Sequence, residues 1–180
     1  VASQIYELQQ QASAEVVAVG VGSPGKVDST HGVVYDAVNL AWEKINLLDE
    51  ISKRIDQSLP VWIQKDTNLS ALGEYYFGAC QDCSDFVYVG VGSGLGGGVI
   101  SGGRLIMGGD WYAAELGHLS INPDGPLCAC GGRGCAETVA SGPGLVRVTK
   151  MSLAESKGKS ILRDAEGLTS ANIISAAQQG

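Results

Sequence analysis

The sequence has no cluster of basic residues, no long apolar run and no recognisable leader. Its 12 Lys and Arg are outnumbered by 19 Asp and Glu, and the formal net charge is −7. Nucleic-acid binding rests on cations that neutralise phosphates, so this balance argues against a general nucleic-acid surface. A membrane span needs roughly 20 apolar residues in a row, and none is expected here. The first residues lack the basic flank and apolar centre of a signal peptide, so we expect a cytoplasmic protein.

Repeats and low-complexity tracts are absent too, and the composition is that of a folded chain. Hydrophobic residues make up 44% of the 180 residues, enough to bury a sizeable core in one domain or two small lobes. The 26 glycines crowd into 90–109 and 125–144, which predicts tight turns and close backbone approaches there. The chain opens on Val1 within an amphipathic helical pattern and stops just after another helix, so we expect a piece of a longer protein.

Apolar runs and helical patterns alternate along the chain, which predicts an α/β protein. Expected strands are the Val-rich 15–25, which reads as parallel, then 31–36, 61–63, 85–92 and 96–101. Expected helices are 46–59, 66–78, 142–151 and 169–178. Asn46 caps the first helix with Asp49 as its partner, the apolar face runs from Leu47 to Leu59, and Pro60 follows the end.

The densest glycine segment is 92–98, Gly-Ser-Gly-Leu-Gly-Gly-Gly. Backbone N–H groups that no side chain screens can cradle phosphate oxygens. No Gly-Lys-Ser/Thr follows, so the segment is not a Walker A loop, and a strand follows where a dinucleotide fingerprint needs a helix. A phosphate loop and a simple glycine-rich β-hairpin both remain open.

Three of the five cysteines stand within eight positions, and a histidine precedes them by ten residues. Structural zinc takes four tetrahedral nitrogen or sulfur ligands, which His118, Cys128, Cys130 and Cys135 would supply. Glycines between the cysteines let the chain fold back for the last of them. A closed site of this kind would brace a loop and perform no chemistry itself. Buried free thiols or a disulfide are the alternatives, and the lack of a secretion signal argues against the disulfide.

The other two cysteines, Cys80 and Cys83, form a separate Cys-x-x-Cys pair. The pattern is compatible with a redox pair or half of a metal site. It follows the end of a predicted helix, and no second pair is left to complete a four-cysteine site. We therefore expect a loop pair with no role and no metal.

Carboxylates gather around these motifs. Asp66 stands where a strand gives way to a helix, the place where ligands bind in open α/β sheets. Glu115 and His118 are three residues apart and share a side if that stretch is helical. A cysteine loop that folds back on His118 would bring Glu137 towards Glu115. For each carboxylate alone, a capping or surface role is the simpler interpretation.

With these motifs the sequence resembles the ROK family of bacterial sugar kinases and sugar-responsive repressors, and the related kinase domain for N-acetylmannosamine. The matching stretches run from about Val16 to Gly142 and are VGVGSPGKVD, VWIQKDTNLSALGEYYFG, FVYVGVGSGLGGGVISGGRLIMGG, AAELGHLSINPDGP and CACGGRGCAETVASG. The resemblance implies the actin-like ATPase (ribonuclease H-like) architecture of two lobes, here as a partial chain. Residues 1–78 would be the remainder of the N-terminal lobe, and 79–180 the start of the larger C-terminal lobe.

The resemblance also implies roles for particular residues. Asp66 would be the catalytic base for the sugar hydroxyl. The residues facing the sugar would be Asn39, Lys65, Asp66, Glu115, His118 and Glu137. The phosphate loop would be formed by Gly92, Ser93, Gly94, Gly96 and Gly97. Zinc would be held by His118, Cys128, Cys130 and Cys135, and ATP with Mg²⁺ would supply the phosphoryl group.

Two features depart from the family pattern. The residue before the catalytic Asp is usually Asn in the kinases and His in the best-known repressors, whereas here it is Lys65. We expect this lysine to turn away from the sugar or to pair with a nearby carboxylate such as Asp66. The family's opening Asp-x-Gly-x-Thr phosphate loop and its C-terminal adenosine-binding part are absent, so the chain holds most of a sugar site and half of an ATP site.

Two functions fit these features. The first is an ATP-dependent, glucokinase-like kinase for a glucose- or N-acetylhexosamine-type hexose. The second is the sugar-binding effector domain of a ROK-type repressor, whose DNA-binding domain would lie upstream of Val1. In either case the resemblance implies a sugar as partner and a homodimer, with no membrane and no nucleic acid bound by this chain. The sequence does not specify the sugar.

Overall fold

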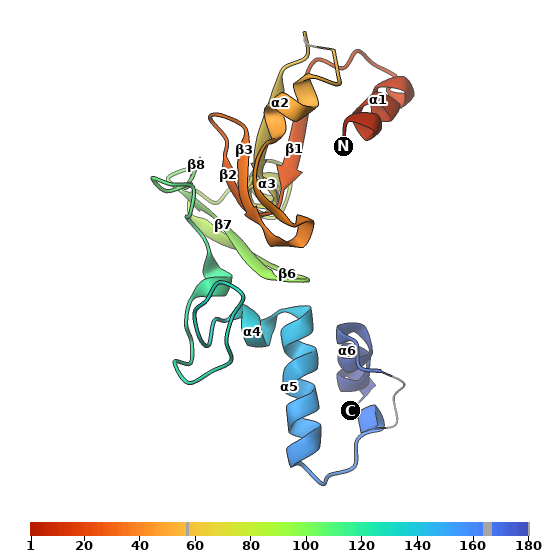
Figure 1. The fold of residues 1–180 in the computed structure, drawn as a ribbon, viewed down its shortest axis with the longest axis vertical. Helices are drawn as coiled ribbons and strands as arrows, with labels where there is room; N and C mark the ends of the chain where they lie inside the picture. Colours follow the sequence, from red (N-terminus) through yellow and green to blue (C-terminus); the bar gives the residue numbers. More distant parts are fainter. Residues whose placement is uncertain (57, 164–166, 180) are drawn as a thin grey trace. The chain divides into compact units, whose positions relative to one another are not determined.

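The structure is a computed structural model, and it describes residues 1–56, 58–163 and 167–179. The chain forms two compact units (Figure 1). Unit 1 comprises Val1–Val87 and Gly98–Ala113, and unit 2 comprises Tyr88–Gly97 and Ala114–Gly180. Helices and strands alternate along the chain, so the predicted α/β class is confirmed. The expected lobe boundary between residues 78 and 79 stays a prediction.

Unit 1 holds two small sheets. Strand β1 (Val19–Ser23) pairs in parallel with β5 (Val61–Lys65), as the Val-rich sequence predicted for β1. Strands β2 (Lys26–Asp28), β3 (Val33–Ala37) and β4 (Trp42–Asn46) form an antiparallel sheet in that order. A Pro-Gly turn joins β1 to β2. Its Gly25 has φ +86, and a Cβ there would lie 2.6 Å from the Tyr35 carbonyl oxygen, so only glycine fits without strain.

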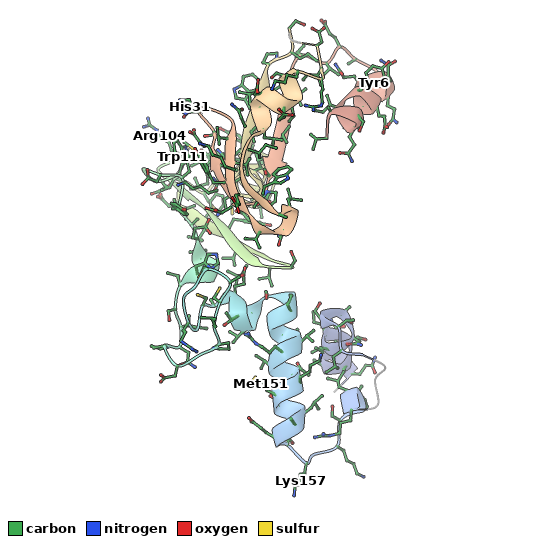
Figure 2. The ribbon with its side chains drawn as sticks, viewed as in Figure 1. Tyr6, His31, Arg104, Trp111, Met151 and Lys157 are labelled. Atoms are coloured by element: carbon green, nitrogen blue, oxygen red, sulfur yellow. The ribbon has the colours of Figure 1, made fainter. Side chains whose placement is uncertain are left out.

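The hydrophobic core of unit 1 is formed by side chains from these strands and from two helices. Helix α1 (Ala2–Gln11) contributes one buried side chain, Ile5, while its Tyr6 points into solvent (Figure 2). Buried aliphatic side chains from the strands and from α2 (Leu47–Ser52) complete the core: Val27, Val34, Ala37, Leu47, Ile51 and Ile63. The strand expected at 61–63 is confirmed as part of β5, and it is buried on one face only. Trp62 is 61% exposed because β5 has its paired strand on one side and alternates its side chains between faces.

Helix α2 begins where the capping pattern predicted, since the Asn46 side-chain oxygen accepts the Asp49 N–H at 3.0 Å. The prediction that the helix continues to residue 59 is wrong. It ends at Ser52, and the Arg54 N–H bonds to the Ile51 carbonyl in a tighter turn. Ile55 still packs against the core although it lies outside the helix. The spacing of apolar residues therefore predicted correctly that Ile55 packs against the core, but it predicted too long a helix.

Helix α3 (Asp66–Tyr76) follows β5 directly and packs against the next strands of unit 1. Strands β6 (Phe86–Val91), β7 (Leu95–Ser101) and β8 (Arg104–Leu105) form a three-stranded sheet in sequence order, with the β6–β7 hairpin passing from one unit into the other. A Cβ at Gly98 of β7 would collide with Ala71 and with the Thr67 carbonyl of α3. This glycine therefore lets the strand backbone pack directly on the helix.

Unit 2 contains the tip of the hairpin, a cysteine-containing loop and a helical C-terminal part. The 3-10 helix η2 (Leu116–His118) precedes the loop, and α4 (Glu137–Ala140) follows it (Figure 1). Helix α5 (Gly142–Glu155) and α6 (Ser170–Gln179) pack against each other, and Met151 lies exposed on the side of α5 away from α6 (Figure 2). The two helices expected at 142–151 and 169–178 are thus confirmed. None of the helices in the described ranges is long and apolar enough to cross a membrane.

Candidate functional site

Asp66 is the first residue of α3, directly after the end of β5. Its carboxylate is exposed, and its Oδ1 accepts the Thr67 N–H at 2.7 Å. The positive end of the helix dipole lies there, which favours the ionised carboxylate. A Cβ at Gly22 of β1 would lie 3.7 Å from the Asp66 Cα, so the paired strand β1 runs next to the start of α3. Asp66 is therefore held by rigid backbone and left accessible.

Other polar groups of unit 1 surround this point. Lys65 ends β5 and is only 7% exposed, and its N–H donates to the Gln64 side-chain oxygen at 2.8 Å. Two buried oxygens next to Asp66, Thr67 Oγ1 and Asn68 Oδ1, have no hydrogen-bond partner among the described residues. Buried polar atoms are normally satisfied, so these two mark a place where a polar ligand or water belongs.

Asn39, the remaining predicted sugar residue of unit 1, lies in the 3-10 helix η1 (Val38–Leu40) between β3 and β4. Its side chain is exposed. The residues on both sides of this short helix, Asp36 and Ala41, have positive φ values of 52 and 53. Such backbone is uncommon for residues other than glycine, and it fixes a sharp turn that presents Asn39 to solvent.

The four predicted metal ligands of unit 2 come together. Their ligand atoms all lie within 4.8 Å of one another: His118, Cys128, Cys130 and Cys135. The Cys128 sulfur is 3.7 Å from His118 Nδ1, and the Cys130 and Cys135 sulfurs are also 3.7 Å apart. Tetrahedral zinc with bonds of about 2.3 Å to sulfur and about 2.0–2.1 Å to nitrogen separates its ligand atoms by about 3.5–3.8 Å. The arrangement thus fits a four-coordinate soft metal.

Backbone hydrogen bonds fold the loop into this shape. The Ile121 N–H donates to the Gly134 carbonyl at 2.8 Å, and the Ala136 N–H donates to the Leu119 carbonyl at 2.9 Å. These bonds lay the segment after η2 beside the last cysteine. Gly134 has φ +63, and a Cβ there would clash with the Asn122 carbonyl, so the fold-back requires glycine. The predicted hinge role of the glycines is supported at this position.

The thiols of the cluster differ in how readily they lose their protons. Among the protein groups alone, burial raises the pKa of Cys135 to about 12, and hydrogen bonds with the neighbouring thiols add to the rise. The Gly132 N–H, followed by the Cys128 thiol, lowers the pKa of Cys130. A metal binds thiolates, so binding must displace protons, above all from the buried Cys135.

His118 connects the metal ligands to a carboxylate. Its Nδ1 faces Cys128, while its Nε2 lies 3.8 Å from the Glu115 Oε2. Glu115 and His118 are at the two ends of η2, so the expectation that they share a side is met by a 3-10 turn. Metal-ligating histidines commonly direct their second nitrogen at a carboxylate or another acceptor, which fixes the ring orientation.

Glu137 joins the cysteine loop to the glycine loop. It is the first residue of α4, and its Oε2 accepts the Leu95 N–H at 2.8 Å. A Cβ at Gly94 would lie 2.6 Å from the same oxygen, so this glycine makes room for the carboxylate. Glu137 also packs against Gly117 of η2, as expected if the loop folds back towards Glu115. The loop, the hairpin tip and η2 therefore form one local structure in unit 2.

The predicted phosphate-loop residues occupy two kinds of backbone. Gly92, Ser93 and Gly94 form the turn between β6 and β7, whereas Gly96 and Gly97 lie within β7. The Gly92 carbonyl accepts the N–H of Gly142 at 2.8 Å, which ties the turn to the start of α5. A Cβ at Gly97 would meet the Leu116 side chain. Glycine at position 97 therefore lets the strand pack closely against Leu116.

A cavity of about 320 Å³ in unit 2 lies next to the glycine turn. It is lined by Ser93, Leu127, Cys128, Ala129, Glu137, Thr138, Ser141, Pro143, Gly144 and Arg147. The Nε and Nη2 atoms of Arg147 are buried and have no hydrogen-bond partner in the described part of the chain. Sequence reasoning missed Arg147, although it is the only basic residue between Arg133 and Lys150. An unpaired guanidinium beside a glycine turn indicates an acceptor-rich, anionic ligand group.

The predicted residues thus divide between the units. Asn39, Lys65 and Asp66 belong to unit 1, whereas Glu115, His118, Glu137 and the glycine turn belong to unit 2. Each unit brings its own residues into a defined local arrangement.

Comparison with known proteins identifies the family. The sequence model of the ROK family matches residues 1–179, and the chain belongs to this family. A glucokinase of Halalkalibacterium halodurans is 33% identical over 171 residues, which is 93% of this chain and 51% of that protein. A glucokinase of Streptomyces coelicolor is 43% identical over 76% of this chain and 42% of its own length. A xylose repressor of Caldicellulosiruptor bescii is 34% identical over 92% of this chain and 41% of the repressor.

Solved structures agree on the fold. A ROK family transcriptional regulator, a homologue of the Escherichia coli MLC protein, has a TM-score of 0.85 at 32% identity over 99% of this chain and 45% of the regulator. A ROK family glucokinase from Streptomyces griseus, in complex with glucose and AMPPNP, has a TM-score of 0.79 at 37% identity over 99% of this chain and 59% of the enzyme. The fold is therefore the actin-like ATPase fold of ROK sugar kinases. The chain spans about half the length of the curated relatives it matches.

Proposed function

We propose that the protein to which this chain belongs is an ATP-dependent hexose kinase of the glucokinase type, with a glucose- or N-acetylhexosamine-type substrate. The observation that carries the proposal is Asp66: an exposed carboxylate held rigidly at the junction of β5 and α3, in a chain similar to glucokinases over most of its length. Beside it lie unsatisfied polar oxygens that suit a polyhydroxylated ligand.

In the proposed mechanism Asp66 accepts the proton of the attacking sugar hydroxyl. The family resemblance gives a sugar-binding role to the Asn39 carboxamide of unit 1 and, within unit 2, to Glu115, His118 and Glu137. Carboxylate oxygens accept hydrogen bonds from neighbouring hydroxyls, and this selects a sugar over an apolar ligand. Lys65 lies beside the base and contributes to the choice of sugar.

Unit 2 supplies the groups that face phosphate. Ser93 of the glycine turn and Arg147 line one cavity, and the two buried guanidinium nitrogens of Arg147 that lack a hydrogen-bond partner among the described residues favour an anion. Mg²⁺ bound with ATP would supply further neutralisation of phosphoryl charge. Zinc held by the four-residue cluster would brace the loop between His118 and Glu137, since such a closed site leaves no open position for chemistry.

The Asp66→Asn substitution tests this function in the full-length protein. Asparagine keeps the hydrogen-bonding shape at the helix start but cannot take a proton, so we expect near-normal melting and sugar binding with turnover lower by at least ~10²-fold. Asp82→Asn, which removes an exposed carboxylate in the loop after α3, serves as the control and should leave turnover unchanged. Wild-type turnover in Asp66→Asn would refute the mechanism.

A second function is favoured by one specific observation. The solved ROK regulator matches this chain with a TM-score of 0.85, against 0.79 for the solved glucokinase. The sugar-binding groups would then sense an effector, and the full-length protein would dimerise and carry a DNA-binding domain. The unmutated full-length protein separates the two functions: sugar binding without phosphorylation by any nucleoside triphosphate supports the effector role.

A further inference from the structure

The cysteine pair after α3 lies outside the proposed site and has an ordered environment. The Cys83 N–H donates to the Cys80 carbonyl at 3.1 Å, which closes a four-residue turn. A turn of this kind holds its end Cα atoms within roughly 7 Å of each other. Disulfides span Cα distances of roughly 4.4–6.8 Å, so this backbone is already compatible with a bridge.

The turn is anchored at both ends. At the helix end, Glu74 accepts the Cys80 N–H on its carbonyl at 3.1 Å and the Ala79 N–H on its carboxylate at 2.9 Å. At the strand end, the Ser84 carbonyl accepts the Gly103 N–H at 2.8 Å. The segment is therefore prearranged, and little chain entropy remains to be lost when its two thiols join.

The two thiols differ in exposure. Cys83 is exposed and Cys80 is partly buried, and both are free thiols. Burial raises the pKa of the Cys80 thiol, and a hydrogen bond with the Cys83 thiol adds to the rise. An exposed thiol reacts first with an external partner, and a neighbouring, less accessible thiol then resolves the product.

A metal site does not explain this pair. In the part of the chain that the structure describes, the group of three or more close metal-ligating side chains is the His118 cluster, which does not include Cys80 or Cys83. Two thiols without further ligands are the composition of a dithiol–disulfide pair.

We propose that Cys80 and Cys83 form a reversible redox site, which low-molecular-weight disulfides oxidise to an intramolecular disulfide. This revises the expectation from the sequence that the pair has no role.

The reaction is two successive thiol–disulfide exchanges. The Cys83 thiolate attacks one sulfur of oxidised glutathione, a mixed disulfide forms on Cys83, and one glutathione thiolate leaves. The Cys80 thiolate then attacks the Cys83 sulfur, the Cys80–Cys83 bond forms, and the second glutathione thiolate leaves. The protein loses two protons and two electrons, and both electrons end in two molecules of reduced glutathione.

The test uses zinc-loaded full-length protein equilibrated with reduced and oxidised glutathione in varied ratio. After acid quenching and alkylation, mass spectrometry should show that the peptide with both cysteines becomes two hydrogens lighter and resists alkylation as the buffer becomes oxidising. A strong dithiol reductant should restore both thiols. Peptide mapping and zinc content keep this change separate from any reaction of the His118 cluster.

Two single substitutions test the order of attack. Cys80→Ser should stop at a stable glutathione adduct on Cys83, because the resolving thiol is gone. Cys83→Ser should leave Cys80 largely unmodified, because the exposed thiol is gone. The proposal is overturned if both wild-type cysteines stay alkylatable in oxidised glutathione, or if wild type accumulates the Cys83 adduct as Cys80→Ser does.

Discussion

Lys65 stands where the family pattern described above leads us to expect Asn in a kinase. It is the last residue of the strand that positions Asp66, and only 7% of its surface is exposed. A buried ammonium has three donors and no acceptor, whereas asparagine donates and accepts. Hydroxyl patterns that suit one side chain therefore do not suit the other.

We predict that Lys65→Asn in the full-length protein changes the relative preference between two hexoses by at least about tenfold, because a lost or gained hydrogen bond in a polar pocket carries strong selectivity. Relative kcat/KM values, or relative Kd values for a sugar-sensing protein, measure the change. Lys53→Asn, at the exposed end of α2, is the control and should keep the wild-type profile. Identical sugar profiles for Lys65→Asn and wild type would remove this residue from the site.

Arg147 is partly buried, and two of its guanidinium nitrogens, Nε and Nη2, are buried without a hydrogen-bond partner among the described residues. Buried donors without an acceptor cost stability, so these two nitrogens indicate a place for a ligand that accepts hydrogen bonds. We predict that Arg147→Met leaves the melting temperature of the ligand-free protein unchanged or raised. The same substitution should weaken binding of a nonhydrolysable ATP analogue about tenfold or more, because a charge-assisted hydrogen bond is lost.

Lys150→Met tests whether any lost charge on α5 has this effect, since Lys150 is exposed one turn further along the helix. Lys150→Met should change neither the melting temperature nor the affinity for the ATP analogue. An Arg147→Met protein that melts lower and binds the analogue normally would show that the guanidinium serves folding.

At the scale of elements, the base of the β7–β8 connection is held by one carboxylate. Asp85 Oδ1 accepts the Ser101 hydroxyl at 2.7 Å and the Gly102 N–H at 2.9 Å. Hydrogen bonds from Ser101, Ser84 and the Gly102 amide lower the pKa of Asp85 to about 2. These bonds favour the ionised form, so their stabilisation is present above the unfolded-state pKa of about 3.9 and disappears as the pH falls through about 2.

We predict that Asp85→Ala lowers the melting temperature near neutral pH, and that the difference from wild type shrinks steadily below about pH 4. Thermal unfolding followed by circular dichroism at several pH values measures it. Asp82→Ala, three residues earlier in the same exposed loop, should show no such pH-dependent difference. If the difference in melting temperature between wild type and Asp85→Ala stays constant down to about pH 2, the ionised form of Asp85 is not what stabilises the turn.

Some starts and ends of helices and turns could be predicted from the sequence, and others could not. The Asn46 cap, the Pro24-Gly25 turn and the start of α3 were predictable because local side-chain chemistry determines them. The end of α2 at Ser52 was not, because apolar residues such as Ile55 continue the helical spacing while packing against the core from outside the helix. The spacing of apolar residues predicts which side chains are buried. It predicts where a helix ends only if a helix-stopping residue stands at the same place.

The candidate site divides in the same way. The grouping of His118 with the three cysteines was predictable, because residue types that bind metals and glycines that allow sharp turns occur together in a short stretch of sequence. Arg147 and the unsatisfied oxygens of Thr67 and Asn68 were not, because only packing reveals which polar atoms are buried without a partner. The hydrogen bond from Leu95 to Glu137 spans 42 residues, and no local pattern encodes it.

At the scale of the whole molecule, the family fold serves both kinases and repressors, so fold alone does not choose between them. Both kinds of relative match most of this chain at comparable identity. The cysteine cluster would serve either function equally, because it organises the loop that ends in Glu137. The proposed metal dependence concerns unit 2 alone and can be tested without knowing the sugar.

We predict one zinc per chain, bound by His118 and the three clustered cysteines. Chelation should remove amide-exchange protection in unit 2 at Ile121 and Ala136, whose N–H groups hold the folded loop, while the β1–β5 pair of unit 1 stays protected. Cys130→Ser should lose zinc and sugar affinity, whereas Cys83→Ser should keep both. Because binding displaces thiol protons, zinc affinity should fall as the pH falls. Elemental analysis that finds no zinc in metal-replete protein, or equal loss of protection in both units, would contradict a zinc site that braces this loop alone.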